Sequence, residues 1–329
     1  MSIIVCFRIF YLFFVYTMSM KNPEVFQGER KINYVKNYFE GWYFKHSEGD
    51  LGISFIPGIH VKNGAKRAFV QVITKKSSYC VFYHFSEFKF SSTPFYVQVG
   101  NNTFSKNKVV LDIDDEKQNL KIFGTLHFSN IQEIEKSRMS PNIMGPFSHV
   151  PFMECNHGIL SMKHKVRGKI FVNDDGYEFS NGDGYIEKDF GTSFPKTYLW
   201  CQANSFDNPS CSLSFSIANI PFGLFSFRGF ICAFIVNGKE YRFATYNNSK
   251  VKKCDIADDS VDILTQKGKY SLAIKCDNVH KFELLSPVKG GMEKPIWETI
   301  DSAIDVTLKD GDEIIFSGVS DNAGLEFVK

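Results

Sequence analysis

Short segments that alternate in side-chain character recur along this chain, and turn-forming residues separate them. Within residues 79–90, Val81, Tyr83 and Phe85 occupy alternate positions, as expected for one face of a β-strand. Asn-Gly pairs at 63–64 and 237–238 lie between β-branched runs, which is a strong local signal of a β-hairpin. Strands at such regular spacing are typical of antiparallel sandwiches and barrels, so we predict an all-β protein.

The expected strands divide into two similar groups, with roughly eight or nine on each side of residue 190. Because an eight-stranded barrel encloses about one small ligand, we predict two tandem barrel- or sandwich-like lobes, over 21–190 and 191–329. A turn is expected at 181–184, and the only helix candidate lies at 130–138. Residues 129–157 contain three prolines and are predicted to form a long connection, of the length that is often functional. The expected strands are 38–45, 52–61, 67–74, 79–90, 95–99, 109–113, 120–128, 158–172, 185–189, 198–206, 212–220, 225–236, 240–246, 260–266, 269–276, 279–285, 298–308 and 312–318.

Residues 1–20 form an apolar leader that we treat apart from the fold. The run at 9–17 is shorter than the roughly 20 residues that a membrane-spanning helix needs. Three alternatives remain for the leader: a secretory signal, a membrane anchor, or a translation start at Met18 or Met20. The leader has no small-residue cleavage site, and it is not an Arg- and Ser-rich transit peptide, which argues against a plastid location. We expect a cytoplasmic or peripheral membrane protein.

Charge and cysteine usage exclude several classes of function. A net charge of +2, with no run of five like charges, argues against nucleic-acid binding. The eight cysteines include no C-x-x-C pair, so they are expected to be buried free thiols of a reducing compartment. His157 and His164 are seven residues apart and lack a metal-ligand spacing, so no metal site is predicted. No G-x-S-x-G nucleophile motif is present.

The stretch at 182–206 carries the most chemistry of the chain. In a strand over 198–206, Tyr198, Trp200, Gln202 and Asn204 share one face, and aromatic walls with a few polar groups are typical of ligand pockets. The 34 phenylalanines have two interpretations: a β-rich core, or a pocket for a hydrophobic small molecule.

Four stretches together resemble the tocopherol cyclase family. They are YFEGWYFK at 38–45, MECNHG at 153–158, GYIEKDFGTSFPKTYLWCQANSF at 184–206 and SPVKGGMEKPIWE at 286–298. Phe190 stands where the family motif is expected to have Trp. The resemblance implies two lipocalin-like β lobes. It also implies closure of a prenylated hydroquinone to a chromanol, without a cofactor. The ligand would then be a prenylated quinol or related lipid, compatible with contact at a membrane surface.

Ring closure of this kind protonates an alkene and lets a phenol oxygen capture the carbocation. It needs an acid held protonated in a dry pocket, and the candidates are Asp189, Glu187, Glu154 and Glu40. Glu187 and Asp189 share a strand face with Tyr185, so our hypothesis is that Asp189 is the acid and Glu187 raises its pKa. The alternative is that Lys188 and nearby backbone amides pair these carboxylates in a structural turn.

Other residues are candidates for the remaining roles. His157, close to Glu154, is the candidate base, with a purely structural histidine as the alternative. Gln202 and Asn204 are candidates for orienting the quinol hydroxyls, and Trp42 and Trp200 for lining the cation site or filling a core. A non-catalytic lipid-binding module would have the same barrels without the acid. Whether a carboxylate faces the cavity distinguishes the two functions.

Overall fold

The computed structural model describes residues 22–29, 31–150, 153–222, 225–277 and 282–329, so the leader at 1–20 lies outside the described residues. Within these ranges the regular structure consists of β-strands and short 3-10 helices, which confirms the all-β prediction. The strands are β1 (Tyr38–Glu48), β2 (Leu51–Lys62), β3 (Ala65–Thr74), β4 (Ser78–His84), β5 (Phe88–Ser92), β6 (Phe95–Val99), β7 (Asn102–Ser105), β8 (Lys108–Asp115), β9 (Leu120–Gln132), β10 (Cys155–Val172), β11 (Asp175–Gly191), β12 (Tyr198–Ala203), β13 (Ser212–Phe222), β14 (Phe225–Val236), β15 (Lys239–Ala244), β16 (Lys250–Ile256), β17 (Val261–Lys267), β18 (Tyr270–Cys276), β19 (Phe282–Val288), β20 (Gly291–Asp310) and β21 (Glu313–Val328). The 3-10 helices are η1 (Phe85–Glu87), η2 (Glu116–Gln118), η3 (Gly145–His149) and η4 (Thr245–Asn247).

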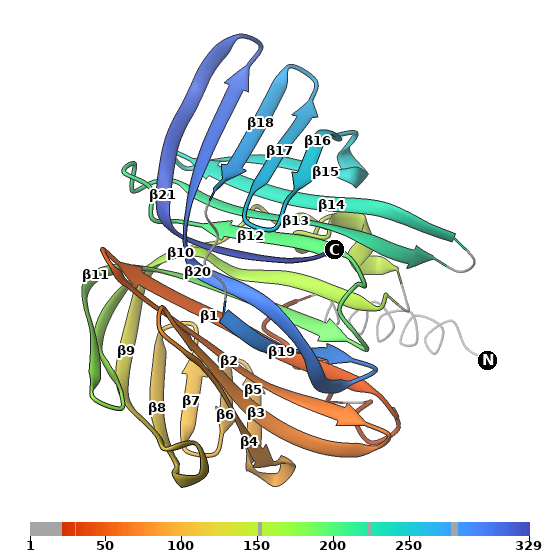
Figure 1. The fold of residues 1–329 in the computed structure, drawn as a ribbon. Coiled ribbons are helices and arrows are strands. Elements are labelled where there is room, and N and C mark those ends of the chain that lie inside the picture. Colours follow the sequence, from red (N-terminus) through yellow and green to blue (C-terminus); the bar gives the residue numbers. More distant parts are fainter. Residues whose placement is uncertain (1–21, 30, 151–152, 223–224, 278–281) are drawn as a thin grey trace, which may run out of the picture.

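The first eleven strands form one antiparallel sheet in the order β4-β3-β2-β1-β11-β10-β9-β8-β7-β6-β5. The sheet curls until β2 and β3 approach β6, so it is nearly closed into a barrel (Figure 1). Bulges in β10 assist this curvature, and at one of them Gly168 has φ of 130°, where a Cβ would meet the carbonyl oxygen of Thr125.

The remaining strands form a second antiparallel sheet in the order β15-β14-β13-β12-β21-β20-β18-β17-β16, with β19 paired to β20. The two sheets form the two tandem lobes that we predicted (Figure 1). The hairpin of β19 and the first half of β20 reaches over the first lobe. There the Gln71 side chain exchanges two hydrogen bonds with the backbone of Leu285, at 3.1 and 3.0 Å. That 21–190 and 191–329 are separate folding units stays a prediction.

The local turn chemistry explains why the hairpins form where they do. Asn63 and Gly64 have φ of 51° and 84°, and Asn237 and Gly238 have φ of 50° and 79°. Two successive positive φ angles are what a type I′ turn requires, so both predicted Asn-Gly hairpins are confirmed.

Three local predictions are wrong. The single strand expected over 79–90 is two strands, β4 and β5, because η1 interrupts it at Phe85–Glu87. Residues 181–184 form no turn, because β11 runs unbroken from Asp175 to Gly191 and pairs with β1 and β10. Residues 130–138 form no helix: β9 continues to Gln132, and extended chain follows. The backbone of Glu135 there bonds to Glu240 and Arg242 of β15 instead of forming helical bonds.

Apolar side chains gather in three places: inside each lobe and between the lobes. The cluster between the lobes contains Tyr43, Tyr185 and Trp200 as well as aliphatic side chains such as Ile159 and Ile296. Within the described ranges, no helix has the length and apolar character needed to cross a bilayer.

Candidate active site

A cavity opens between the two lobes, with an empty volume of about 1430 Å³ counted out to its mouth. Both lobes contribute to its wall, and most of the wall is apolar. Phe39 and Phe69 come from the first lobe, and Phe230, Leu284 and Met292 come from the second. Such a cavity suits a largely hydrophobic ligand.

Five carboxyl groups and one histidine interrupt this apolar wall. They are Glu154, Glu187, Asp189, Glu298, Glu326 and His157. Carboxylates therefore face the cavity, which is the feature that we expected to distinguish an enzyme from a simple binding module.

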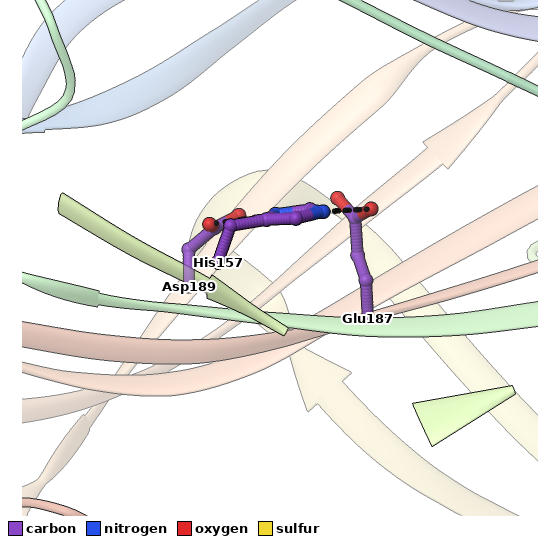
Figure 2. Close-up of side chains that lie close together, drawn as sticks. All are labelled: His157, Glu187 and Asp189. Carbon is purple, nitrogen blue, oxygen red and sulfur yellow. Dashed lines mark hydrogen bonds and ion pairs between the residues drawn. The ribbon is translucent and has the colours of Figure 1, made fainter. Parts of the chain in front are cut away.

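Asp189, His157 and Glu187 form a linear group, which we call the trio (Figure 2). His157 Nδ1 lies 3.0 Å from Asp189 Oδ1, and His157 Nε2 lies 3.5 Å from Glu187 Oε2. The imidazole therefore lies between two carboxylates, in hydrogen-bond contact with Asp189 and at a longer ion-pair distance from Glu187. This arrangement suits a proton shared between the groups, since imidazole can carry a proton at either nitrogen.

Strand register explains why these three residues meet. Glu187 and Asp189 are two apart in β11 and so project from the same face. In the neighbouring strand β10, His157 is the register partner of Asp189, and Ile159 is the partner of Glu187. The histidine side chain therefore begins opposite Asp189 and reaches along the strand to Glu187.

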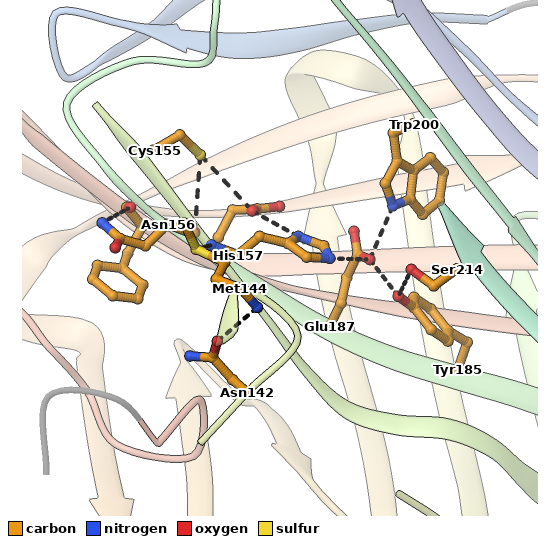
Figure 3. A network of polar contacts seen from close by, with 11 residues as sticks. Asn142, Met144, Cys155, Asn156, His157, Tyr185, Glu187, Trp200 and Ser214 are labelled. Atoms are coloured by element: carbon orange, nitrogen blue, oxygen red, sulfur yellow. Dashed lines mark hydrogen bonds and ion pairs between the residues drawn. The ribbon is translucent and has the colours of Figure 1, made fainter. Parts of the chain in front are cut away.

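Side chains from three strands hold Glu187 (Figure 3). Its Oε2 accepts hydrogen bonds from the Tyr185 hydroxyl at 2.6 Å and from Trp200 Nε1 at 3.0 Å. The Tyr185 oxygen also lies 3.1 Å from the Ser214 hydroxyl of β13. Donors aimed at one carboxylate oxygen fix its position and favour its ionised form.

Burial and neighbouring charges shift the pKa values of His157 and Glu187 in opposite directions. Burial disfavours the charged form of His157, but the charges of Glu187 and Asp189 outweigh it and raise the pKa of the imidazole to about 9. Burial raises the pKa of Glu187, and the positive charge of His157 opposes that rise. At neutral pH the imidazole accordingly holds a proton between the two carboxylates.

Glu298 and Glu326 form a second acidic group in the cavity wall, on β20 and β21. The two are direct register partners. The Tyr43 hydroxyl donates to Glu298 Oε1 at 2.6 Å, and the Tyr198 hydroxyl donates to Glu326 Oε1. Burial raises the pKa of Glu298 to about 8 and that of Glu326 well above its usual range.

Our sequence prediction missed this second group. Glu298 closes the fourth family-like stretch, which was the available signal. Glu326 lies near the C-terminus, where no motif indicated a function.

The connection between β9 and β10 closes one side of the cavity, and Met144 and Phe147 of this connection line it. Met144 Sδ lies 3.1 Å from the backbone nitrogen of His157, and the Tyr246 hydroxyl donates to the carbonyl of Ile143 at 2.8 Å. The long connection thus spans from the first lobe to the second and contacts the trio (Figure 3).

The other predicted site residues lie in different places. Glu154 and Trp200 line the cavity, and Tyr185 lies behind Glu187 without reaching the cavity surface. Gln202 and Asn204 are buried beyond Trp200 and do not line the cavity, and Asn204 Nδ2 donates to the carbonyl of Gly184 at 2.8 Å.

Glu40 and Trp42 belong to the interior of the first lobe rather than to the cavity wall. They project from the face of β1 opposite to Tyr43. Glu40 forms a buried ion pair with Lys188 at 2.5 Å. In the sequence, Glu40 and Trp42 alternate with the cavity residues Phe39, Gly41 and Tyr43, so choosing between the two faces required the tertiary structure.

The trio is also the group of described residues whose ligand atoms lie close enough to hold a metal ion, all within 4.8 Å of one another. The two carboxylates approach opposite nitrogens of one imidazole ring. An ion held here would take one nitrogen of the imidazole ring and one oxygen from each carboxylate.

Comparisons with known proteins agree with this architecture. The crystal structure of CghA with Sch210972 has a TM-score of 0.55 at 9% identity, with 89% of each chain covered. Kievitone hydratase from Nectria haematococca has a TM-score of 0.50 at 11% identity, with 95% of this chain and 92% of that chain covered. At such low identity these likenesses show the fold alone, and no curated protein sequence matches. The model of the tocopherol cyclase-like family matches residues 127–328, which is more than half of the chain and includes both acidic groups. The chain therefore belongs to the tocopherol cyclase-like family.

Proposed function

We propose that this protein is an enzyme that closes a prenylated hydroquinone to a chromanol by proton transfer. The observation that carries the proposal is the set of carboxyl groups, with one histidine, in the wall of an otherwise apolar cavity. An apolar wall suits the prenyl tail, and buried carboxyls can hold a proton at neutral pH. Membership in the tocopherol cyclase-like family supports the same chemistry.

The reaction has two proton transfers and one ring closure. A carboxylic acid of the cavity gives its proton to the trisubstituted alkene, and a tertiary carbocation forms. A phenol oxygen then forms the new C–O bond, and its proton passes to a base. The product is an isomer of the substrate, so the protein regains its starting charge once the proton returns to the acid.

The trio is suited to the accepting side of this reaction, which replaces our sequence-based hypothesis that Asp189 is the acid and His157 the base. Burial raises the pKa of Glu187 to about 7, and whenever Glu187 is ionised beside the protonated imidazole the trio has a net negative charge. It can therefore stabilise a nearby cation and accept the phenol proton. Asp189 has 23% of its side chain exposed, against 6% for Glu187, so we assign the contact with the phenol to Asp189. His157 orients Asp189 and shares the proton.

Aromatic rings near the trio can stabilise the carbocation. Tyr43 and Trp200 both line the cavity, and their rings meet edge-on with centroids 5.3 Å apart. A desolvated cation over an aromatic face gains roughly 2 kcal/mol. Trp200 also donates to Glu187, so the ring and the carboxylate are held together.

Hydration is a second candidate, favoured by the shared fold of a protein named kievitone hydratase. If water instead of the phenol captures the carbocation, the product is a tertiary alcohol. A lipid-binding module without catalysis is the third candidate. The cavity-facing carboxylates argue against it, because burying charge costs free energy that an inert lipid would not recover.

The test is to incubate the purified protein with a phytylated dimethylhydroquinol and to separate the products by chromatography. We expect chromanol from the wild type, and a loss of about 10²–10⁴-fold in kcat in Asp189→Asn, the usual range for one acid–base group. Asp175→Asn is the matched control, since Asp175 lies on the same strand in an exposed pair with Lys76.

Each outcome of this experiment is informative. A tertiary alcohol would favour hydration. Retention of the quinol without any product would favour the binding module. Chromanol formation that survives Asp189→Asn would move the accepting role to Glu187.

A further inference from the structure

The proposed cyclisation needs a proton donor as well as an acceptor, and the inference below rests on that proposed function. The trio already contains two carboxylates held as hydrogen-bond acceptors. The second acidic group, Glu298 and Glu326, lines the same cavity from the second lobe. A proton donor must be a carboxyl group of the cavity that keeps its proton, and is therefore neutral, at neutral pH.

Glu187 and Glu298 differ in how many hydrogen-bond partners stabilise their ionised forms. Glu187 Oε2 faces three groups that favour a negative charge: Tyr185, Trp200 and the imidazole of His157. Glu298 accepts one hydrogen bond, from Tyr43, and forms no ion pair within the part of the chain that the structure describes. With fewer donors in an apolar wall, Glu298 is the carboxyl that is less stabilised as an anion.

The strand register strengthens this difference. Glu298 on β20 and Glu326 on β21 are directly opposed, and both are buried, at 2% and 7% exposure. Opposed side chains on neighbouring strands have Cβ atoms about 4.5–5.5 Å apart. In this dry wall, burial and the nearby charge of Glu187 both disfavour the ionised form of each carboxyl and raise its pKa.

Proton transfer to an alkene produces a carbocation, and Glu298 lies beside aromatic rings that can stabilise one. The tyrosine that donates to Glu298 is Tyr43, and its ring meets Trp200 edge-on. A carbocation formed beside Glu298 would therefore lie next to the aromatic pair. Tyr43 is held in place in turn, since the Ser54 hydroxyl donates to its oxygen at 3.2 Å.

We propose that Glu298 is the catalytic proton donor of the cyclisation, acting from the second lobe into the cavity that the trio also lines. The O–H bond of the Glu298 carboxylic acid breaks, and the alkene π electrons form the new C–H bond. The phenol oxygen forms the C–O bond, and its proton goes to Asp189. Glu298 is then a carboxylate, and proton exchange through solvent at the cavity mouth returns both groups to their starting states.

Protonation of Glu298 sets the expected pH dependence. The ionisable groups that face Glu298 are Tyr43 and Lys45 of β1, Glu187 of β11 and Glu326 of β21. Burial and the charge of Glu187 raise the pKa of Glu298 to about 8, against the Tyr43 hydrogen bond and the charge of Lys45. The acid is present below this pKa, so kcat should fall as the pH rises through about 8.

The first experiment compares Glu298→Gln with Glu293→Gln in the chromanol assay. Glu293 is on the same strand but lies outside the cavity, paired with Lys62. We expect Glu298→Gln to lose about 10²–10⁴-fold in kcat with little change in quinol binding, and Glu293→Gln to match the wild type. An active wild type together with a fully active Glu298→Gln variant would overturn the assignment while leaving the proposed function intact.

A second variant separates chemistry from structure. Tyr43→Phe removes the hydrogen bond that favours the charged form of Glu298, so its pKa should rise. The fall of kcat at high pH should then move to higher pH. A variant with lower activity and an unmoved pH profile would mean that Tyr43 and Glu298 only support the fold.

The protonation state can be measured without any substrate. Infrared spectra at pH 7 should contain the carbonyl absorption of buried protonated carboxylic acids, to which Glu326 also contributes because burial raises its pKa. This absorption should be weaker in Glu298→Gln than in the wild type and unchanged in Glu293→Gln. If the quinol proves not to be a substrate, the proposed function fails, and the infrared result still decides whether Glu298 holds a proton. A band unchanged in Glu298→Gln would refute the donor role.

Discussion

The ion pair between Glu40 and Lys188 offers a quantitative test of which carboxylates support the fold and which face the substrate. Both side chains are fully buried, with Nζ and Oε1 2.5 Å apart. Glu40 also accepts hydrogen bonds from the Gln27 and Gly28 amides at 2.8 Å each and from the Tyr38 hydroxyl at 2.6 Å. These contacts attach residues 27 and 28 to the first lobe.

Glu40→Gln should strongly destabilise the protein. It leaves the Lys188 ammonium buried, with the Val25 carbonyl at 2.5 Å and the rings of Trp42 and Phe190 at 4.9 and 5.1 Å as partners. The glutamine side chain introduced at position 40 would also place its NH₂ group next to the three groups that donate hydrogen bonds to the Glu40 carboxylate. Removing one partner of a buried pair costs about 3–5 kcal/mol of unfolding free energy. Asp175→Asn breaks the exposed pair with Lys76, at 2.8 Å, and should cost about 0–1 kcal/mol.

Urea unfolding of the wild type and both variants, followed by tryptophan fluorescence and circular dichroism, measures the two losses. Trp42 reports directly on the altered site, because the Lys188 ammonium lies over its ring. Below the unfolding transition, the kcat of Glu40→Gln should stay near that of the wild type. A Glu40→Gln variant as stable as Asp175→Asn but without turnover would refute this reasoning and return Glu40 to the catalytic candidates.

Two further predictions concern the trio and its aromatic neighbour. Because the folded protein raises the pKa of His157 to about 9 from an ordinary value near 6.5, its protonation stabilises the fold fully below about pH 6.5, and this stabilisation is lost as the pH rises through 9. The difference in unfolding free energy between the wild type and His157→Gln should therefore shrink between these pH values, and a difference independent of pH would contradict the shared proton. Trp200→Phe keeps an aromatic ring beside Tyr43, whereas Trp200→Leu does not. If the ring stabilises the carbocation by roughly 2 kcal/mol, Leu should lower kcat about 30-fold more than Phe, and equal rates in single-turnover measurements would exclude this role.

The all-β architecture was predictable from local signals, because alternation and turn chemistry act over a few residues. The Asn-Gly hairpins at 63–64 and 237–238 depend on residues that tolerate positive φ, and both formed as predicted. The same local reasoning failed at 181–184, where pairing of β11 with β1 and β10 on both sides overrides the turn preference of Gly182 and Gly184. At 130–138, contacts with β15 decided against the helix.

The trio was partly predictable, because two of its members are two residues apart in one strand. The spacing of Glu187 and Asp189 sets their common face, and the family resemblance drew attention to His157. What the spacing did not contain is the register between β10 and β11, which positions the imidazole between the two carboxylates. Register depends on pairing between distant segments, and no local pattern specifies it alone.

Only the tertiary structure brought the members of the second acidic group together. Tyr43 and Glu298 are 255 residues apart in the chain, and their hydrogen bond exists because the two lobes pack against each other. The sequence by itself determined the strands, the turns and the alternation of faces. The packing of the lobes decided which carboxyl groups share one dry cavity, because burial and close approach between distant strands, more than residue type, set their protonation and therefore their chemistry.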